Sequence, residues 1–269
     1  MAVVSSYYDV ARGSGWSVLD GVLQWGPVLD PEQLPAQPMA VIAARALPGP
    51  PVDVLVGHNT DEVGTFLDTS HYAASYPTLV YETMLLSVFG IRGSSAVKAQ
   101  YAHYGLPAGV EQLDLIMTDY WFKCAKEDIA AAVSAAGGQA WSYRFHHNIS
   151  FGPDIWIPVG LPQCVNKVCH TAELVFVFGN TGDWEFTAEE REFSDALIVA
   201  WTNFAHTGNP SAPPQRIATS RRALRQASPF DWPPFSNDTR LSLVLRPGWD
   251  VEDSSDVCAF WDGIGYAQH

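Results

Sequence analysis

Apolar residues gather in three short runs, each with the length of a β-strand. Residues 52–59 (VDVLVGHN) are mostly apolar and β-branched, which is typical of a strand buried on both faces of a parallel sheet. Residues 140–148 (AWSYRFHHN) begin with aromatic and polar side chains in alternation, and residues 240–245 (RLSLVL) form the last run. The pattern therefore predicts three strands.

The segments between these runs carry apolar residues at helical spacing. They are residues 76–90, 94–105 and 113–138. A further helix is expected after Thr187, because Thr187 and Glu190 form a capping-box pattern and Gly208 follows the last periodic residue. Strands that alternate with helices predict a parallel α/β sheet, in which functional residues lie on loops at the carboxyl ends of the strands.

Three segments lack such periodicity. Residues 26–53 are rich in proline around a short helical patch at 39–47, and residues 151–169 read as a loop broken by glycine and proline. Residues 211–229 are first proline-rich and then basic, which indicates an exposed loop or insertion.

The net negative charge of the chain argues against some classes of binding partner. The chain has 29 acidic and 15 basic residues among 269, a formal charge of -14, so it repels nucleic-acid backbones and anionic lipid. We expect a small neutral or cationic ligand instead. No apolar run approaches the roughly 20 residues of a membrane-spanning helix. The first 15 residues show neither the basic nor the apolar region of a signal peptide, so none is expected there.

Candidate acid–base residues follow the first strand and the long loop. His170 begins the stretch HTAELVFVFG, and either Asp61 or Glu62 is a carboxylate that could orient its imidazole. The alternatives are a solvated acidic loop for Asp61 and Glu62, and a helix-terminal or core residue for His170. Glu173 lies one helical turn after His170 and is a candidate supporting residue, or a first-turn glutamate favoured by the helix dipole.

A metal site is a competing interpretation for the histidines and cysteines nearby. Cys164, Cys169 and His170 lie close in sequence to His146 and His147, but structural zinc sites use paired C-x-x-C motifs that this chain lacks. We therefore expect no metal, and a local disulfide between the two cysteines. The sequence also contains two N-glycosylation acceptor patterns, at Asn148 and Asn237.

Several longer motifs occur in an order that resembles one known family. They are VLVGHNTDEVGTFL, TDYWFKCAKEDIAAAVSAAGGQAWSYRF, VCHTAELVFVFG, FSDALIVAWTNFAHTGNP and CAFWDGIGY. Together they resemble the C-terminal half of a type-B carboxylesterase, the α/β-hydrolase group that includes cholinesterases and bile-salt-activated lipase. The resemblance implies a carboxylesterase domain portion over residues 25–269 after an irregular segment at 1–24. It also implies the incomplete sheet of half an α/β-hydrolase fold, with parallel strands and flanking helices.

The resemblance assigns roles to individual residues. Glu62 matches the acid and His170 the base of a Ser-Glu-His triad. The family's long-range disulfide would join Cys124 to Cys258, which leaves Cys164 and Cys169 to pair locally, and two disulfides imply a secreted or extracellular full-length protein. Two departures are Thr171, where the family usually has glycine, and DEVG, where the family has DEG.

The nucleophile expected of this fold is absent from the sequence. A G-x-S-x-G elbow occurs nowhere, and neither Ser14 nor Ser95 has glycine at both positions that the motif requires, two residues before and two after the serine. We therefore expect the C-terminal portion of a carboxylic-ester hydrolase, without a cofactor, inactive alone and completed by an N-terminal half that carries the serine and oxyanion hole. The alternatives are a non-catalytic, cholinesterase-like binding or adhesion protein, and a storage or structural protein.

Overall fold

A computed structural model describes residues 29–32, 36, 41, 50–67, 77–211, 231–253 and 255–264. The predicted segment at 1–24, and nearly all of the patch at 39–47 and the loop at 211–229, lie outside the described residues. The chain divides into two compact units. A helical unit contains Met1–Gln37 and Phe66–Ile116, and a sheet unit contains Pro38–Thr65 and Met117–His269.

Two helices dominate the described part of the helical unit. Helix α4 (Pro77–Tyr101) includes most of both predicted helical runs, at 76–90 and 94–105, and has a kink between them where Gly90 has a φ of 65°. Glycine tolerates this left-handed conformation without a Cβ clash. A 3₁₀ turn, η3 (Ala102–Tyr104), follows, and α5 (Val110–Thr118) begins the predicted helix at 113–138.

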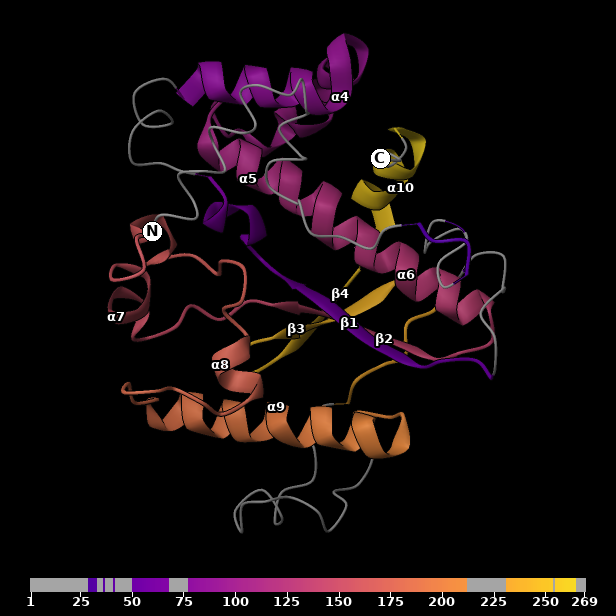
Figure 1. Ribbon diagram of the computed structural model, residues 1–269, viewed down its shortest axis with the longest axis vertical. Coiled ribbons are helices and arrows are strands. Elements are labelled where there is room, and N and C mark those ends of the chain that lie inside the picture. The colour runs from indigo at the N-terminus through magenta and orange to yellow at the C-terminus, as the bar shows by residue number, and fades with distance from the viewer. Residues whose placement is uncertain are drawn as a thin grey trace. The chain divides into compact units, whose positions relative to one another are not determined.

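The sheet unit is built around four strands in the order β1-β2-β3-β4 (Figure 1). These are β1 (Val54–Asn59), β2 (Ala140–Phe145), β3 (Leu241–Leu245) and β4 (Asp250–Asp253). The first three pair in parallel, as predicted. Strand β4 was not predicted; it pairs antiparallel to β3 after a short turn and makes the sheet mixed.

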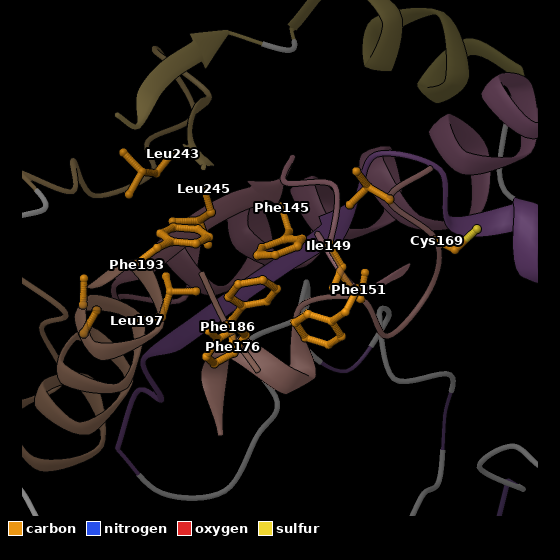
Figure 2. Close-up of a cluster of buried hydrophobic side chains, with 14 of the residues drawn as sticks. Phe145, Ile149, Phe151, Cys169, Phe176, Phe186, Phe193, Leu197, Leu243 and Leu245 are labelled. Carbon is orange, nitrogen blue, oxygen red and sulfur yellow. The ribbon is translucent and has the colours of Figure 1, made fainter. Parts of the chain in front are cut away.

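Helix α9 (Ala188–Thr207) packs on one face of this sheet through an aromatic core. Its capping box forms as predicted, because Thr187 Oγ1 accepts the Glu190 N–H and the Glu190 carboxylate accepts the Thr187 N–H. Figure 2 shows the cluster of buried side chains contributed by strands, α9 and the loops that precede it. The described members at its centre include Phe145, Phe176, Phe193, Leu197, Leu243 and Leu245. Alternate residues of β2 and β3 therefore supply the apolar face.

Helix α6 (Cys124–Ala135) covers the opposite face of the sheet (Figure 1). A π-helical turn, η4 (Asp119–Lys123), precedes it and separates it from α5. Buried polar side chains lie between helix and sheet, because the Lys126 ammonium donates to Ser142 Oγ (2.5 Å) and Ser242 Oγ (2.7 Å). The two faces of one sheet thus differ, one being aromatic and the other partly polar.

Short helices replace much of the predicted loop at 151–169. They are α7 (Gly152–Trp156) and the 3₁₀ turn η5 (Pro162–Cys164), and a single helical turn, α8 (Leu174–Val177), follows His170. Helix α10 (Ser255–Ile264) closes the described chain. None of the helices within the described ranges has the length and apolar character needed to cross a bilayer.

Candidate active site

The end of β1 places the acidic candidate. Strand β1 ends at Asn59, and a 3₁₀ turn, η1 (Glu62–Thr65), begins two residues later. This short connection folds the Glu62 side chain back on the strand end, where Oε1 accepts the Asn59 backbone N–H at 2.6 Å. The Glu62 side chain is only 4% exposed. The backbone at the end of β1 therefore holds one oxygen of the Glu62 carboxylate in place.

Asp61 and the local disulfide position the histidine. Asp61 forms a parallel bridge with Cys169, its N–H donates to Val168 O (3.0 Å), and its Oδ2 accepts the Val168 N–H (2.9 Å). Cys169 is also joined to Cys164. Asp61 thus holds the backbone next to His170, and the structure resolves the choice between the two acids, because the carboxylate that contacts the imidazole belongs to Glu62.

Glu62 and His170, called the dyad below, are joined by a short hydrogen bond. His170 Nδ1 lies 2.5 Å from Glu62 Oε2, across 108 residues of sequence. This hydrogen bond raises the pKa of His170, although partial burial acts in the opposite direction. The His170 side chain is 39% exposed while its carboxylate partner is buried. A buried carboxylate against one nitrogen of a partly exposed imidazole is the arrangement of an acid-oriented general base.

Asn59 is a site residue that the sequence did not identify. Its Nδ2 donates to Glu173 Oε2 (2.6 Å) and lies 3.4 Å from Glu62 Oε1, so one amide connects two carboxyl groups. The Glu173 carboxylate accepts this hydrogen bond from Asn59, and the Glu173 side chain makes no helix-capping bond to α8. Burial raises the pKa of Glu173, against the effect of the Asn59 hydrogen bond.

Thr171 explains why glycine suits the position after the histidine. Its φ is 75°, in the left-handed region that glycine adopts freely and that is a genuine outlier for a β-branched residue. This conformation turns the chain from His170 into α8, with the Leu174 N–H donating to Thr171 O at 3.1 Å. The departure from the family pattern is therefore accommodated by backbone strain and leaves the dyad in place.

The remaining predicted residues have other contacts. Both disulfides implied by the resemblance are present, Cys124–Cys258 and Cys164–Cys169. His146 Nδ1 lies 2.8 Å from Thr60 Oγ1, and His147 Nε2 lies 3.1 Å from Glu190 Oε1. Across the described ranges, no cluster of histidine, cysteine and carboxylate side chains is arranged to hold a metal ion.

The described serines and asparagines singled out from the sequence have contacts or exposure of their own. Ser95 Oγ donates to Ile91 O at 3.1 Å within α4, and Ser14 lies outside the described residues. The side chains of Asn148 and Asn237 are exposed. Ser150, which follows Asn148, donates its hydroxyl to Glu190 Oε2 at 2.6 Å and so has a carboxylate as its acceptor.

Comparison with known proteins decides the family. The model of the carboxylesterase family matches residues 11–261, which is nearly the whole chain and includes the dyad. The chain therefore belongs to the carboxylesterase family. This finding confirms the type-B carboxylesterase resemblance.

Individual carboxylesterase relatives support the same assignment. The chain is 27% identical to the Crystal protein of Dictyostelium discoideum, covering 96% of this chain and 45% of that protein. It is 30% identical to the para-nitrobenzyl esterase of Bacillus subtilis (strain 168), over 86% of this chain and 41% of that esterase. A solved PNB esterase superposes with a TM-score of 0.65 at 26% identity, covering 92% of this chain and 45% of the esterase. The α/β-hydrolase fold class is thereby confirmed, and the chain spans less than half the length of these relatives.

Proposed function

We propose that Glu62 and His170 are the acid and the base of a Ser-Glu-His triad for carboxylic-ester hydrolysis. The 2.5 Å contact between His170 Nδ1 and Glu62 Oε2, in a chain of the carboxylesterase family, is the observation that supports it. Glu62 holds the tautomer with the proton on Nδ1 and stabilises the imidazolium. The other ring nitrogen, Nε2, accepts the proton of a serine hydroxyl during attack and returns it to the leaving alcohol.

The serine and the oxyanion hole belong, in this proposal, to a second segment. The 269 residues contain no G-x-S-x-G motif, and more than half the length of each relative has no counterpart here. We infer that the partner is the N-terminal half of the same kind of domain, and that this chain alone does not turn over esters, since neither an acyl-enzyme nor its oxyanion can be stabilised. The acidic surface suits small neutral or cationic esters.

Asn59 and Glu173 act as positioning residues in the same proposal. Asn59 is 1% exposed, and its amide reaches toward both carboxyl groups, so it restricts where each can lie. Glu173 contributes a second acidic group, and its charge favours the imidazolium form of His170. Their effect is expected on the orientation and proton affinity of His170, because residues that orient a reacting group act through it.

A chimera provides the test. This chain replaces the matching segment of the Bacillus para-nitrobenzyl esterase, and hydrolysis of p-nitrophenyl acetate is compared among the parent chimera, His170→Ala, Glu62→Gln and a His206→Ala control. His206 is an exposed histidine in the last turn of α9. We expect His170→Ala to lower kcat by about 10³-fold or more, Glu62→Gln to reduce it strongly, and the control to match the parent.

The outcomes separate the parts of the proposal. A chimera whose activity survives His170→Ala rules out the assigned base. Turnover and fluorophosphonate labelling by the 269-residue chain alone would show that it holds its own nucleophile, contrary to the proposal. A folded chimera that is inactive with both catalytic residues intact would favour the alternative of a non-catalytic, cholinesterase-like binding or adhesion protein.

We also propose secretion of the full-length protein, with glycans on Asn148 and Asn237. Both asparagine side chains are exposed, and both cysteine pairs are oxidised, which is typical of extracellular proteins. Expression in a secretory eukaryotic host should yield a protein whose mass falls after treatment with an N-glycosidase. Loss of the mass difference in an Asn148→Gln/Asn237→Gln variant identifies the sites, and an unchanged mass in the parent contradicts the proposal.

A further inference from the structure

The π-helical turn η4 and the residue before it lie close to the dyad. Val63, which follows Glu62, donates its backbone N–H to Oγ1 of Thr118, the residue before η4, at 3.3 Å. Within η4, the ring of Phe122 lies against the imidazole of His170, with ring centroids 5.5 Å apart and planes inclined by 52°. The segment from Thr118 to Phe122 therefore contacts both Val63, next to Glu62, and His170.

The turn that carries Phe122 is wider than a turn of an α-helix. In η4 the Cys124 N–H donates to Asp119 O, five residues earlier, where an α-helix would use the fourth. Successive residues of an α-helix are about 100° apart around its axis, so the residue that a π-turn adds redirects the following side chains by about that angle. Such turns occur frequently at functional sites.

Contacts with α10 hold η4 from the other side. The rings of Tyr120 and Trp261 are 4.8 Å apart, and Cys124, directly after the turn, forms the disulfide with Cys258. Lys123 Nζ also lies 3.7 Å from Asp119 Oδ1 within the turn. Phe122 therefore approaches His170 from an element that is anchored independently of the histidine loop.

We propose that Phe122 is a positioning residue for His170, holding the imidazole toward Glu62 and stabilising the imidazolium that forms when the base accepts a proton. The inference rests on the proposed function and adds a residue to it. An aromatic ring within about 6 Å of a cation attracts it through the ring quadrupole. Among the described groups, the carboxyl groups of Glu62, on η1, and Glu173, just before α8, also favour the charged imidazole.

Titration of His170 in the isolated 269-residue chain, followed by NMR of labelled histidine, tests the role directly and requires no turnover. Leucine at position 122 keeps the apolar bulk and removes the π system. We therefore expect Phe122→Leu to lower the proton affinity of His170 about two- to fivefold. Phe122→Tyr, which keeps the ring, should restore it. A matched Phe204→Leu control, in α9 where Phe204 contacts Trp141, should leave the His170 titration unchanged.

Glu62→Gln separates this inference from the proposed function. If Glu62→Gln lowers the proton affinity of His170 and Phe122→Leu does not, the role of Phe122 is wrong and the dyad stands. If Glu62→Gln has no effect, the dyad itself fails. If Phe122→Leu unfolds the chain, seen as a loss of dispersion in its amide spectrum, a second measurement tests the contact. Nuclear Overhauser effects between the Phe122 and His170 rings are then sought in the unmodified chain, and their absence overturns the proposed contact.

Discussion

Replacement of Lys126 by methionine should remove a large pH dependence of stability. The ammonium is 3% exposed and lies between α6 and the sheet, with Ser142 Oγ, Ser242 Oγ and the Tyr143 carbonyl as its acceptors. Three oxygens satisfy its three N–H donors, yet no carboxylate is among them. Burial consequently lowers the pKa of Lys126 to about 8, from an ordinary value of 10.5.

The sign and size of the effect follow from linkage. Because the folded-state pKa lies below the unfolded-state value, the unfolded chain binds the extra proton between pH 8 and 10.5, and the folded state gains stability as pH rises through this window. Each pKa unit corresponds to about 1.4 kcal/mol, so the full gain is about 3 kcal/mol. Methionine has nearly the same length and no proton to lose, so the Lys126→Met variant lacks this gain.

Urea unfolding at several pH values measures the difference. The free energy of unfolding of the parent minus that of Lys126→Met should increase by about 2 to 3 kcal/mol from pH 7 to pH 10. Other titrating groups cancel in this difference. Lys98→Met, which removes a half-exposed lysine paired with Glu82, is the matched control and should give a nearly flat difference. A flat difference for Lys126→Met as well would refute the buried-ammonium argument.

Three further predictions concern stability. Thr171→Gly should stabilise the fold by about 0.5 to 1 kcal/mol in urea unfolding, because relief of the left-handed strain exceeds the entropy that glycine adds to the unfolded chain. Glu190→Gln should lower the free energy of unfolding by about 2 kcal/mol at pH 7 and change it little at pH 2. Despite burial, hydrogen bonds from Ser150 and Thr187 hold the pKa of Glu190 at about 2. The stabilisation by the carboxylate is therefore complete above pH 4.5 and is lost as pH falls toward 2. Cys124→Ala/Cys258→Ala should lose about 4 to 5 kcal/mol, measured by thermal or urea unfolding, since that disulfide spans 134 residues.

The sequence predicted the ends of a helix correctly where one residue's own side chain or backbone preference determines the local conformation. The capping box at Thr187 and the glycine end at Gly208 bound α9 as predicted, because the side-chain acceptor and the left-handed cap are properties of those residues themselves. The strands at 52–59, 140–148 and 240–245 were found from their buried pattern, although β2 ends three residues earlier than predicted.

Long-range pairing explains what the sequence did not show. Strand β4 reads Asp-Val-Glu-Asp, a charged edge-strand pattern without the apolar run of a buried strand, and it exists because β3 offers it a free edge. Asn59 and Phe122 contact Glu173 and His170, which are remote from them in sequence. The sequence could not show whether Asp61 or Glu62 contacts His170, because that depends on the direction of the 3₁₀ turn η1 after β1.

The disulfide between Cys124 and Cys258 gives the chain a particular covalent topology. It closes a ring that contains β2, α9, β3 and His170, while Glu62 lies on the chain outside that ring. A single peptide-bond cleavage anywhere between the two cysteines opens the ring without dividing the molecule, so the two products remain one covalent unit until the disulfide is reduced. His170 and Glu62 therefore remain covalently linked after a single proteolytic cleavage between Cys124 and Cys258.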